Sequence, residues 1–525
     1  MSTQGAGVVI RSFAADFEQL CRTEAHRRVV LDAKTGRVWT YDAFAELVLS
    51  FRRRLAGAGV RAGERIFSIL PNSLEQFAAC LAAMISGIDF CPISPLSSMD
   101  EARRFVSLGH STTGLVPPTI DRVVSQALQD ACRRHALIPV AMRGVVEPSS
   151  IEAAPIESPS SGKLILFTSG TTASPKAIVL DGDRLWSSAI AWAGWHAVLT
   201  PEARFYNMLP MSYLGGLFNL GLIPLACRGS VVITDAFSGI SALRFWPEVE
   251  EQGVTVLWLA PTIVRSLLAL HRPGGMSRTP WAGVRLAFLG MAPSTLDDKA
   301  RFESAFGIPL LENYALSETT FLTSEALGVA GRREAGSVGP ALPWVTLRTR
   351  APEPHAAAEV EVQTPFLFDG YLGANGEVRR DLTPDGFFRT GDLGEVRRGD
   401  NVLVLKGRSK DIVKKGGYLL VLRDLEELAE RHAGVEEAVA VGMPHPFYGE
   451  TAVLCVRLAE GIPARPTLEA LRGTLMEALA KFKWPTEIVA VASFPKTESG
   501  KIQRQRLASV LTDRQGIVDA VGVSG

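Results

Sequence analysis

Residues 164–176 read LILFTSGTTASPK, and this stretch decides which fold the chain is expected to adopt. An aliphatic run typical of a β-strand enters a loop of hydroxyl side chains and one glycine, and the loop ends in Pro-Lys. Small residues let backbone N–H groups approach phosphate oxygens, and hydroxyls add donors. The stretch therefore predicts a strand followed by a phosphate-binding loop, with Lys176 adding a positive charge. A Ser/Thr-rich surface turn would have the same composition.

The loop differs from a Walker A loop, because GxxxxGK[ST] occurs nowhere in the chain. On both sides of it, short aliphatic runs alternate with helical patterns, which argues for parallel sheets with helical cover. Strands are expected at residues 65–70, 90–93, 163–168, 230–234, 255–259 and 284–289. Helices are expected at residues 74–86, 241–251 and 261–270.

A chain of 525 residues exceeds what one hydrophobic core usually supports, so two or more domains are expected. Residues 147–162 are rich in Pro, Ser and Gly and predict a surface loop or linker. A compact pattern lies near the C-terminus, with strands expected at 438–442, 452–458 and 487–491 and a helix at 467–479. We predict an α/β fold: a large N-terminal domain of parallel-sheet subdomains at residues 1–408 and a small α+β domain at residues 409–525.

Composition excludes several other classes of protein. Basic and acidic residues number 55 each, which gives no bulk attraction to nucleic acid or to an anionic membrane. The six cysteines form no CxxC pair and the eight histidines no HExxH motif, so neither a disulfide framework nor a zinc site is predicted. The N-terminus lacks the pattern of a secretory signal, and the longest apolar stretch is too short to span a bilayer. We expect a cytoplasmic enzyme without a nucleic-acid partner.

Other motifs accompany the phosphate loop in a fixed order. They are LPNS at 70–73, GIDFCPISP at 87–95, GMAP at 290–293, NYALSE at 313–318, RTGD at 389–392, GRSKD at 407–411 and PKTESGKIQR at 495–504. Any one of them could arise by chance, but the ordered set resembles the conserved blocks of the adenylate-forming superfamily. That superfamily comprises acyl- and aryl-CoA synthetases, the adenylation domains of peptide synthetases, and luciferases. The resemblance covers residues 29–504.

The resemblance implies a site for ATP and Mg²⁺. A carboxylate must attack the α-phosphorus of ATP and release pyrophosphate, so neutralising two anions dominates the barrier. Glu318 is the implied Mg²⁺ ligand, because Mg²⁺ prefers carboxylate and phosphate oxygens. Tyr314 would stack on adenine, and Asp392 would accept hydrogen bonds from the ribose. The implied nucleotide-binding residues are Thr168, Ser169, Gly170, Thr171, Thr172, Lys176, Asn313, Tyr314, Ser317, Asp392 and Arg408.

Lys501 and Glu318 are the catalytic residues that the resemblance implies. The Lys501 ammonium would bridge the incoming carboxylate and the α-phosphate in the first half-reaction. The small domain is implied to be a mobile lid that turns about Lys410 between the two half-reactions. One orientation brings Lys501 to the nucleotide, and the other brings Gly416 and Gly417 toward a thiol tunnel.

The chain departs from the family pattern at the phosphate loop and at the acid pocket. Ala173 and Ala177 replace glycines of the loop; if either position needs a positive φ, alanine is strained there and ATP binding weakens. Ala315 replaces another glycine, and its methyl group would narrow the pocket. Tyr213 stands where many relatives have a histidine, so any acid/base role of that histidine is lost. The implied pocket residues are Tyr213, Gly290, Met291, Ala292 and Ala315.

The sequence favours an apolar or aromatic acid over an amino acid. Amino-acid-activating members carry Asp in an Asp-xx-Ser context, and residues 205–219 contain no such pattern. Trp192, Trp195 and His196 lie on an expected helix where the family often builds its acyl pocket, and core packing explains them equally well.

Three functions remain open at this level. The first is an acid–thiol ligase that makes acyl-CoA, and coenzyme A is the expected acceptor. The second is an acyl-AMP ligase that loads the phosphopantetheine of a separate acyl carrier protein. The third is an adenylate-binding protein with turnover impaired by Ala173 and Ala177. The sequence leaves open the identity and chain length of the acid and whether the protein is a monomer or a homodimer.

Overall fold

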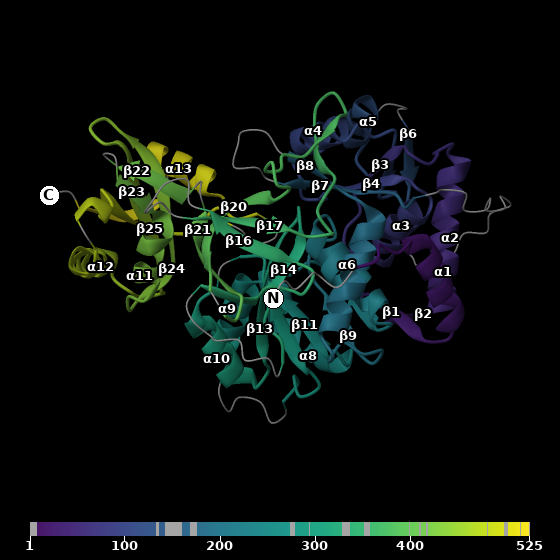
Figure 1. Ribbon diagram of the computed structural model, residues 1–525, viewed down its shortest axis with the longest axis horizontal. Helices are drawn as coiled ribbons and strands as arrows, with labels where there is room; N and C mark the ends of the chain where they lie inside the picture. The colour runs from purple at the N-terminus through teal and green to yellow at the C-terminus, as the bar shows by residue number, and fades with distance from the viewer. Residues whose placement is uncertain are drawn as a thin grey trace. The chain divides into compact units, whose positions relative to one another are not determined.

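The computed structural model describes residues 8–132, 136–141, 160–168, 176–272, 279–292, 294–327, 336–350, 358–397, 399–408, 411–415, 418–479, 481–497, 502–514 and 516–523. The chain forms two compact units, which are described separately (Figure 1). The first unit contains Met1–Thr346 and Gln363–Gly386, and the second contains Leu347–Val362 and Phe387–Gly525. The chain therefore passes between the units three times, and a domain boundary at residue 408 stays a prediction.

The first unit contains two large sheets. The strands of one are β1 (Arg28–Asp32), β2 (Arg37–Thr40), β9 (Arg204–Asn207), β10 (Ser230–Ile233), β11 (Val256–Leu259), β12 (Leu286–Leu289), β13 (Leu310–Leu316) and β14 (Thr320–Ser324). They run in the order β14-β13-β12-β11-β9-β10-β1-β2. The inner strands pair in parallel, and the antiparallel pairs β13–β14 and β1–β2 close the two ends. Another strand, β15 (Ser337–Pro340), contacts β14.

The other sheet carries the strands on either side of the phosphate loop. Its members are β3 (Arg65–Ser68), β4 (Asp89–Pro92), β5 (Thr113–Val116), β6 (Ala136–Pro139), β7 (Leu164–Thr168), β8 (Lys176–Leu180), β18 (Gly370–Leu372) and β19 (Val378–Arg379). The order is β19-β18-β8-β7-β4-β3-β5-β6. From β7 to β6 the pairs are parallel, whereas β7–β8, β8–β18 and β18–β19 are antiparallel.

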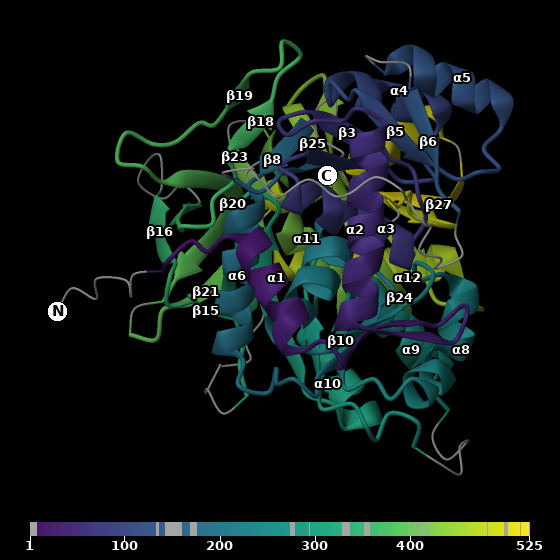
Figure 2. The same cartoon turned by 90° about the vertical axis from the view of Figure 1, so that its right-hand side faces the viewer.

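Helices cover these sheets. They are α1 (Phe13–Thr23), α2 (Tyr41–Gly57), α3 (Leu74–Ile85), α4 (Met99–Leu108), α5 (Arg122–Ala131), α6 (Gly182–Trp195), α7 (Ile223–Ala226), α8 (Gly239–Glu251), α9 (Pro261–Leu270), α10 (Leu296–Phe306) and the π-helix η1 (Gly215–Leu222). All residues of α3 are buried, and after Glu75 and Gln76 in its first turn the helix is apolar on every side, as expected for a buried helix. Helix α2 packs on both α1 and α3, and Figure 2 shows these three helices together.

The second unit is built from two further groups of strands. The first group is β16 (Thr346–Arg350), β17 (Glu359–Gln363), β20 (Phe388–Val396) and β21 (Val402–Arg408), in the order β21-β20-β17-β16. The second is β22 (Ile412–Lys415), β23 (Tyr418–Val421), β24 (Val435–His445), β25 (Gly449–Leu458), β26 (Glu487–Val491) and β27 (Ile517–Gly522). Its helices are α11 (Leu422–Glu430), α12 (Ala464–Ala478) and α13 (Arg504–Asp513), with a 3₁₀ turn at Lys481–Lys483.

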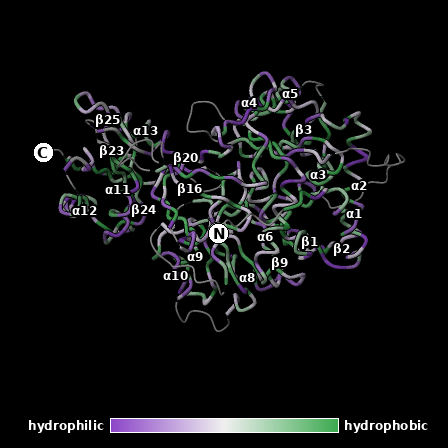
Figure 3. The backbone as a smooth tube through the Cα atoms, viewed as in Figure 1, coloured by the Kyte–Doolittle hydropathy of each residue, from purple (hydrophilic) through white to green (hydrophobic). Residues whose placement is uncertain are grey.

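Strand β24 has a hydrophobic core on each of its faces. Ala438 and Ala440 belong to a core with α11 and α12, whereas Val439 and Val441 belong to a core with α13. Successive side chains of a strand point to opposite faces, which explains this alternation. Figure 3 shows α12 with both hydrophobic and hydrophilic residues, and its buried residues are Leu468, Leu471 and Leu475. That spacing gives a single apolar stripe.

The predicted fold class is confirmed: the large sheets are rich in parallel strands, and a separate C-terminal domain follows. The predicted helix at 261–270 and strand at 487–491 coincide with α9 and β26. Most of the predicted linker at 147–162 lies outside the described residues. Within the described parts of the chain, none of the helices combines the length and the apolarity that crossing a membrane requires.

Candidate functional site

The phosphate loop connects two antiparallel neighbours in the sheet. Strand β7 ends at Thr168, β8 begins at Lys176, and these two residues are partners in the register. The predicted phosphate ligands Ser169, Gly170, Thr171 and Thr172, and the substitution Ala173, lie outside the described residues. Ala177 follows in β8, buried and without a positive φ, so the strain considered for that position is absent.

A tyrosine that the sequence analysis missed connects the two predicted charges of the nucleotide site. The Lys176 ammonium lies 4.3 Å from the ring centroid of Tyr371, a distance suited to a cation–π contact. The Tyr371 hydroxyl donates a 2.7 Å hydrogen bond to Glu318 Oε1. Burial and the nearby Glu318 carboxylate raise the pKa of Tyr371, so its hydroxyl keeps its proton at neutral pH. The chain thus brings together Lys176, Tyr371 and Glu318 within the first unit.

Glu318 fits the predicted role of Mg²⁺ ligand. Its side chain is half-buried, and Tyr371 occupies only one carboxylate oxygen; the other accepts no hydrogen bond from a described residue. One carboxylate together with phosphate oxygens is a common Mg²⁺ environment. Within the described part of the chain, no group of three or more His, Cys, Asp or Glu side chains is arranged to hold a metal ion.

The turn that presents Glu318 holds a strained residue. Thr320 has φ +55°, which is unfavourable for a β-branched residue. Its hydroxyl lies 2.8 Å from the hydroxyl of Ser188 on α6, and both side chains are buried. The backbone oxygen of Glu318 also accepts a hydrogen bond from Phe368 N at 2.8 Å. These contacts fix the turn from α6 on one side and from the segment before β18 on the other.

Strands β12 and β13 bring the predicted adenine and acid segments together. Asn313 donates through Nδ2 to the carbonyl of Leu289 at 2.9 Å, and a Cβ on Gly290 would lie 2.8 Å from Asn313 Oδ1. A larger residue at position 290 would therefore clash with the side chain of Asn313. Tyr314, the next residue in β13, is buried, while Ser317 is half-buried and Ala315 exposed.

The predicted pocket residue Met291 lies against the segment that contains Tyr213. Met291 has φ +72°, and its Sδ would lie 3.6 Å from a Cβ on Gly215. Gly215 begins the π-helix η1, whose carbonyls at Gly216 and Leu220 accept hydrogen bonds from Asn207 Nδ2 at 2.8 and 3.0 Å. Inserting a polar side chain of this kind satisfies carbonyls in a widened helical turn. Tyr213 and Ala292 are both half-buried.

An aromatic cluster surrounds Phe321 of β14. Trp192 of α6 has its ring centroid 3.7 Å from that of Phe321 and 5.6 Å from that of Trp258. Phe321 is the register partner of Ala315 in the β13–β14 pair. His196 packs against Trp192, and its Nε2 lies 3.2 Å from the Ser324 hydroxyl. Burial lowers the pKa of His196 to about 3, so the imidazole is neutral at pH 7.

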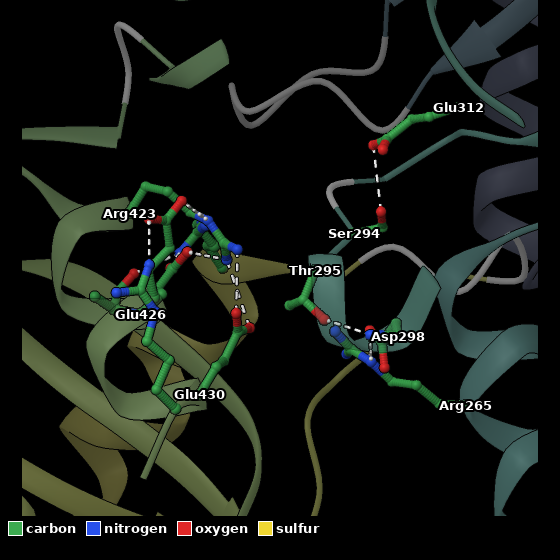
Figure 4. Close-up of polar contacts among 12 residues, drawn as sticks. Arg265, Ser294, Thr295, Asp298, Glu312, Arg423, Glu426 and Glu430 are labelled. Carbon is green, nitrogen blue, oxygen red and sulfur yellow. Dashed lines mark hydrogen bonds and ion pairs between the residues drawn. The ribbon is translucent and has the colours of Figure 1, made fainter. Parts of the chain in front are cut away.

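A buried ionic cluster supports β13 from α10. Lys299 Nζ lies 3.1 Å from Glu312 and 2.9 Å from Glu325, and all three side chains are buried. Ser294 donates a hydrogen bond to Glu312 at 3.3 Å, which ties the segment after Ala292 to β13 (Figure 4). Burial raises the pKa of Glu312 to about 7, and Lys299 opposes the shift. Thr295 caps α10 through the amide of Asp298 at 3.0 Å.

In the second unit, Asp392, which was predicted to bind ribose, forms an ion pair with the predicted nucleotide-binding residue Arg408. Arg408 Nε lies 2.9 Å from Asp392 Oδ1, and the residues are cross-strand partners in β20 and β21. Asp392 is buried, whereas half of the Arg408 side chain is exposed. Glu359 accepts a hydrogen bond from Gly391 N at 3.0 Å, which fixes the backbone of β20 next to Asp392. The predicted hinge Lys410, the tunnel residues Gly416 and Gly417, and Lys501 lie outside the described residues.

Known proteins resemble this chain over almost all of its length. The AMP-binding enzyme family matches residues 17–372, and the C-terminal domain of the same enzymes matches residues 424–501. A sulfoacetate–CoA ligase of Cupriavidus necator is 32% identical over 490 residues, which cover 91% of this chain and 94% of that protein. The chain belongs to the AMP-binding enzyme family.

Other relatives of this AMP-binding enzyme agree with that assignment. An oxalate–CoA ligase of Arabidopsis thaliana is 28% identical over 87% of this chain and 90% of its own. The crystal structure of ATP-bound MatB from Rhodopseudomonas palustris has a TM-score of 0.84 at 25% identity, covering 95% of this chain and 99% of that one. The predictions of the adenylate-forming superfamily and of an AMP-forming acid–CoA ligase that uses ATP and coenzyme A are confirmed.

Two features of the site were absent from the sequence analysis. Tyr371 is 53 residues from Glu318 in the chain, and its surroundings in β18 contain no polar motif. The Lys299 cluster could have been found, because a glutamate in the apolar run of β13 needs a buried partner.

Proposed function

We propose that this AMP-binding enzyme activates a short carboxylic acid as an acyl-adenylate and transfers the acyl group to coenzyme A. The observation that carries the proposal is the link from Lys176 through Tyr371 to Glu318 beside the ends of the phosphate loop. It places a cation and a carboxylate next to a loop suited to phosphate. An ATP whose phosphates lay there would have both a counter-charge and a ligand position for Mg²⁺.

In the first half-reaction, a carboxylate oxygen of the acid attacks the α-phosphorus and pyrophosphate leaves. Lys176 would neutralise charge on the phosphates, and Lys501 would offset the charge of the two converging anions. Tyr314 would stack on adenine, with Asn313 and Ser317 beside it. When bound at Glu318, Mg²⁺ would supply further charge neutralisation. Asp392 would bind the ribose, and Arg408 would contact the ribose or a phosphate.

In the second half-reaction, the thiol sulfur of coenzyme A attacks the acyl carbonyl and AMP leaves. Gly416 and Gly417 would line the path of the thiol after the C-terminal domain has turned about Lys410. This role of the two glycines rests on the family resemblance, because they follow the GRSKD segment.

The aromatic cluster next to Ala315 bears on the size of the acid. Phe321 packs on Trp192 and Trp258 and is the register partner of Ala315, so large rings lie next to that residue, and we expect them to favour a compact acyl group over a long chain. Their rings and the neutral His196 also favour the apolar or aromatic character predicted from the sequence.

A second candidate class is a short acid with another anionic group. It is favoured by relatives named sulfoacetate–CoA, oxalate–CoA and malonate–CoA ligase. A relative at 26% identity is instead named indoleacetate–CoA ligase. The two classes differ in net charge, so one panel of acids separates them.

The test is pyrophosphate release from ATP and Mg²⁺ with each acid, with and without coenzyme A. The panel contains acetate, propanoate, benzoate and indoleacetate, then oxalate, malonate and sulfoacetate, and octanoate as a long acid. Acyl-CoA detected by mass spectrometry with a short acid supports the proposal. Preference for octanoate, or no acid-dependent pyrophosphate with any acid, overturns it.

Two further measurements complete the test. Pyrophosphate without acyl-CoA would indicate a carrier-protein acceptor in place of coenzyme A. Lys501→Ala is expected to lose adenylation while the Kd for ATP stays within about twofold, because its charge is needed mainly in the transition state. Pyrophosphate release at the wild-type rate by this variant would refute the role of Lys501.

A further inference from the structure

The segment before strand β18 lies between the turn of Glu318 and strand β8. Phe368 N donates to the backbone oxygen of Glu318 at 2.8 Å, and Asp369 N donates to the carbonyl of Val179 in β8 at 2.9 Å. The chain then continues into β18, which contains Tyr371 and pairs with β8, as Figure 2 shows. The place of this segment therefore decides where the Tyr371 hydroxyl meets Glu318.

The Asp369 carboxylate is bound by two cations from distant parts of the chain. Lys163 Nζ lies 2.6 Å from Oδ2, and Arg184 Nη1 lies 2.8 Å from Oδ1. The same Arg184 nitrogen donates to the carbonyl of Leu367 at 3.0 Å, so it contacts both the side chain and the backbone of the segment. Each carboxylate oxygen thus has a charged donor, and charge-assisted hydrogen bonds are stronger than neutral ones.

Lys163 connects the segment to the strand that enters the phosphate loop. It directly precedes β7, whose last residue, Thr168, is the register partner of Lys176. The backbone N–H of Lys163 donates to the Asp89 carboxylate at 3.0 Å, which fixes the residue from which the ammonium reaches Asp369. Asp369 is therefore bound from the pair of strands that carries Lys176.

Arg184 connects the segment to the helix that also supports the turn at Glu318. It lies in the first turn of α6, and Ser188 follows one turn later. The Ser188 hydroxyl lies 2.8 Å from that of Thr320, in the turn after Glu318. Helix α6 therefore holds both sides of the Tyr371–Glu318 hydrogen bond, because Arg184 binds the segment before Tyr371 and Ser188 binds the turn after Glu318.

The residue between Asp369 and Tyr371 adds no side-chain contact of its own. Gly370 has φ +150°, and a Cβ there would lie 2.4 Å from the carbonyl oxygen of Arg379. Only glycine fits such a close approach of two backbones. The side chain that fixes this end of β18 is therefore the one before the glycine, Asp369.

The charge of Asp369 keeps two cations together at the segment. Without it, Lys163 and Arg184 would lie around an uncharged group, and like charges repel. The backbone hydrogen bonds of the segment would remain, so we expect a shift of the segment and not its unfolding. Such a shift would loosen the hydrogen bond from Tyr371 to Glu318.

We propose that Asp369 is a positioning residue for adenylation: held by Lys163 and Arg184, it sets the place of the Tyr371 hydroxyl on Glu318. The inference rests on the proposed function, in which Glu318 binds Mg²⁺. Asp369 acts only through Tyr371, whose hydrogen bond orients the Glu318 carboxylate. Groups that orient a metal-binding carboxylate also tune its affinity for the metal.

The experiment compares Asp369→Asn, Arg184→Met and Arg184→Lys, with Asp369→Asn also in a Tyr371→Phe background. Adenylation is measured as pyrophosphate release without coenzyme A over a range of Mg²⁺ concentrations, with the acid that the wild type uses best. We expect Asp369→Asn and Arg184→Met to lower kcat/KM for ATP by about three- to tenfold at limiting Mg²⁺, no more than a hydrogen bond to a charged group contributes. High Mg²⁺ should recover most of the loss, and Arg184→Lys, which keeps the charge, should lose less.

Two measurements without turnover accompany the kinetics. Titration calorimetry follows Mg²⁺ binding to the protein with α,β-methylene-ATP, and Asp369→Asn should weaken this binding by a factor similar to the kinetic loss. In the protein without nucleotide or metal, amide hydrogen exchange across residues 366–372 should be faster in Asp369→Asn, because the segment has lost its side-chain contacts. Unchanged Mg²⁺ binding together with unchanged exchange would contradict the positioning role.

The matched control is Asp16→Asn in helix α1. Asp16 is likewise a carboxylate with two donors, Arg11 at 2.7 Å and the indole N–H of Trp186 on α6 at 2.7 Å. The control therefore removes a charged contact to the same helix, away from the Tyr371–Glu318 hydrogen bond in the chain. We expect it to lower the Tm while the Mg²⁺ dependence of adenylation stays that of the wild type.

The Tyr371→Phe background separates positioning from general damage. If Asp369 acts through the Tyr371 hydroxyl, Asp369→Asn adds no further loss of kcat/KM to Tyr371→Phe. Multiplying losses, or a wild-type Mg²⁺ dependence in Asp369→Asn, would overturn the inference. If Asp369→Asn fails to fold, Arg184→Met decides in the same way, because it keeps the Lys163–Asp369 pair. Failure of the proposed function gives a different result: the wild type itself releases no pyrophosphate with any acid.

Discussion

The hydroxyl of Tyr371 restrains the carboxylate that we assign to Mg²⁺. It donates to Glu318 at 2.7 Å while its ring faces Lys176, so a single side chain sets the spacing of both charges. We predict that Tyr371→Phe lowers kcat/KM for ATP by about tenfold, near the lower end of what a hydrogen bond to a charged group contributes. Higher Mg²⁺ should recover part of the loss. Steady-state kinetics at several Mg²⁺ concentrations measure both effects.

A second tyrosine–glutamate pair provides the control for this prediction. The Tyr206 hydroxyl donates to Glu248 on α8 at 2.6 Å. Tyr206→Phe loses the same kind of hydrogen bond and should lower the Tm while kcat/KM stays unchanged. Equal kinetic effects of the two variants would show that Tyr371 acts through stability alone.

Glu312 gives the protein a stability that depends on pH. Its pKa is raised to about 7, whereas an unfolded glutamate titrates near about 4.3. Between these values the folded state binds the extra proton, so the free energy of unfolding falls as pH rises through this window. Below the lower value both states are protonated, and the contribution of Glu312 to stability is fully present.

We predict that Glu312→Gln removes this pH dependence, because an amide cannot titrate. The free energy of unfolding of the wild type relative to the variant should fall between about pH 5 and pH 7, by at most about 1.4 kcal/mol per pH unit. Urea unfolding of both proteins across this range measures the difference. A difference that stays constant with pH would contradict the assignment.

At the scale of single elements, Ala177 of strand β8 contributes to the stability of the fold. The methyl group of Ala177 is buried in the core beside Phe167 and Leu372, its register partners. Ala177→Gly should lower the free energy of unfolding by about 1–2 kcal/mol, from added backbone entropy and one lost methyl group. Pyrophosphate release by the folded variant should not change. Faster adenylation would show that the alanine limits the loop after all.

The elements of the fold could largely be predicted from the sequence, because each strand or helix carries its own periodicity. Helix α9 begins with Pro261 and its apolar residues follow at helical spacing, which is why its bounds were predicted correctly. The π-helix η1 could not be predicted in the same way. It depends on Asn207, which lies in another element and satisfies two of its carbonyls.

The site could be predicted only where its residues lie in continuous motifs. Lys176, Tyr314, Glu318 and Asp392 each stand in such a motif. Tyr371 joins Lys176 and Glu318 through the pairing of β18 with β8, and strand pairing over this sequence distance leaves no local pattern. The pairing of Asp392 with Arg408 likewise follows from the β20–β21 register.

For the whole molecule, the proposed turn at Lys410 predicts that the two half-reactions can be separated. Lys410→Pro restricts φ at that residue, and proline holds φ near about −65°. The rate of one half-reaction should fall by at least about tenfold while the rate of the other stays within about twofold, because each half-reaction needs a different orientation of the C-terminal domain. The control is Lys410→Ala, which leaves the backbone free to rotate. This variant should catalyse both half-reactions. Pyrophosphate release and acyl-CoA formation from a preformed adenylate are measured separately.

The order of segments along the chain also has a consequence for its synthesis on the ribosome. Strand β8 pairs with β18, but the nascent chain must first produce β9 to β17, including residues 347–362 of the second unit. Until then β8 has one unpaired edge, and Glu318 lacks the hydroxyl of Tyr371. Exposed strand edges invite pairing with other chains. The growing polypeptide is thus expected to depend on chaperones until residue 372 has emerged, and a ribosome that stalls earlier leaves the nucleotide site incomplete.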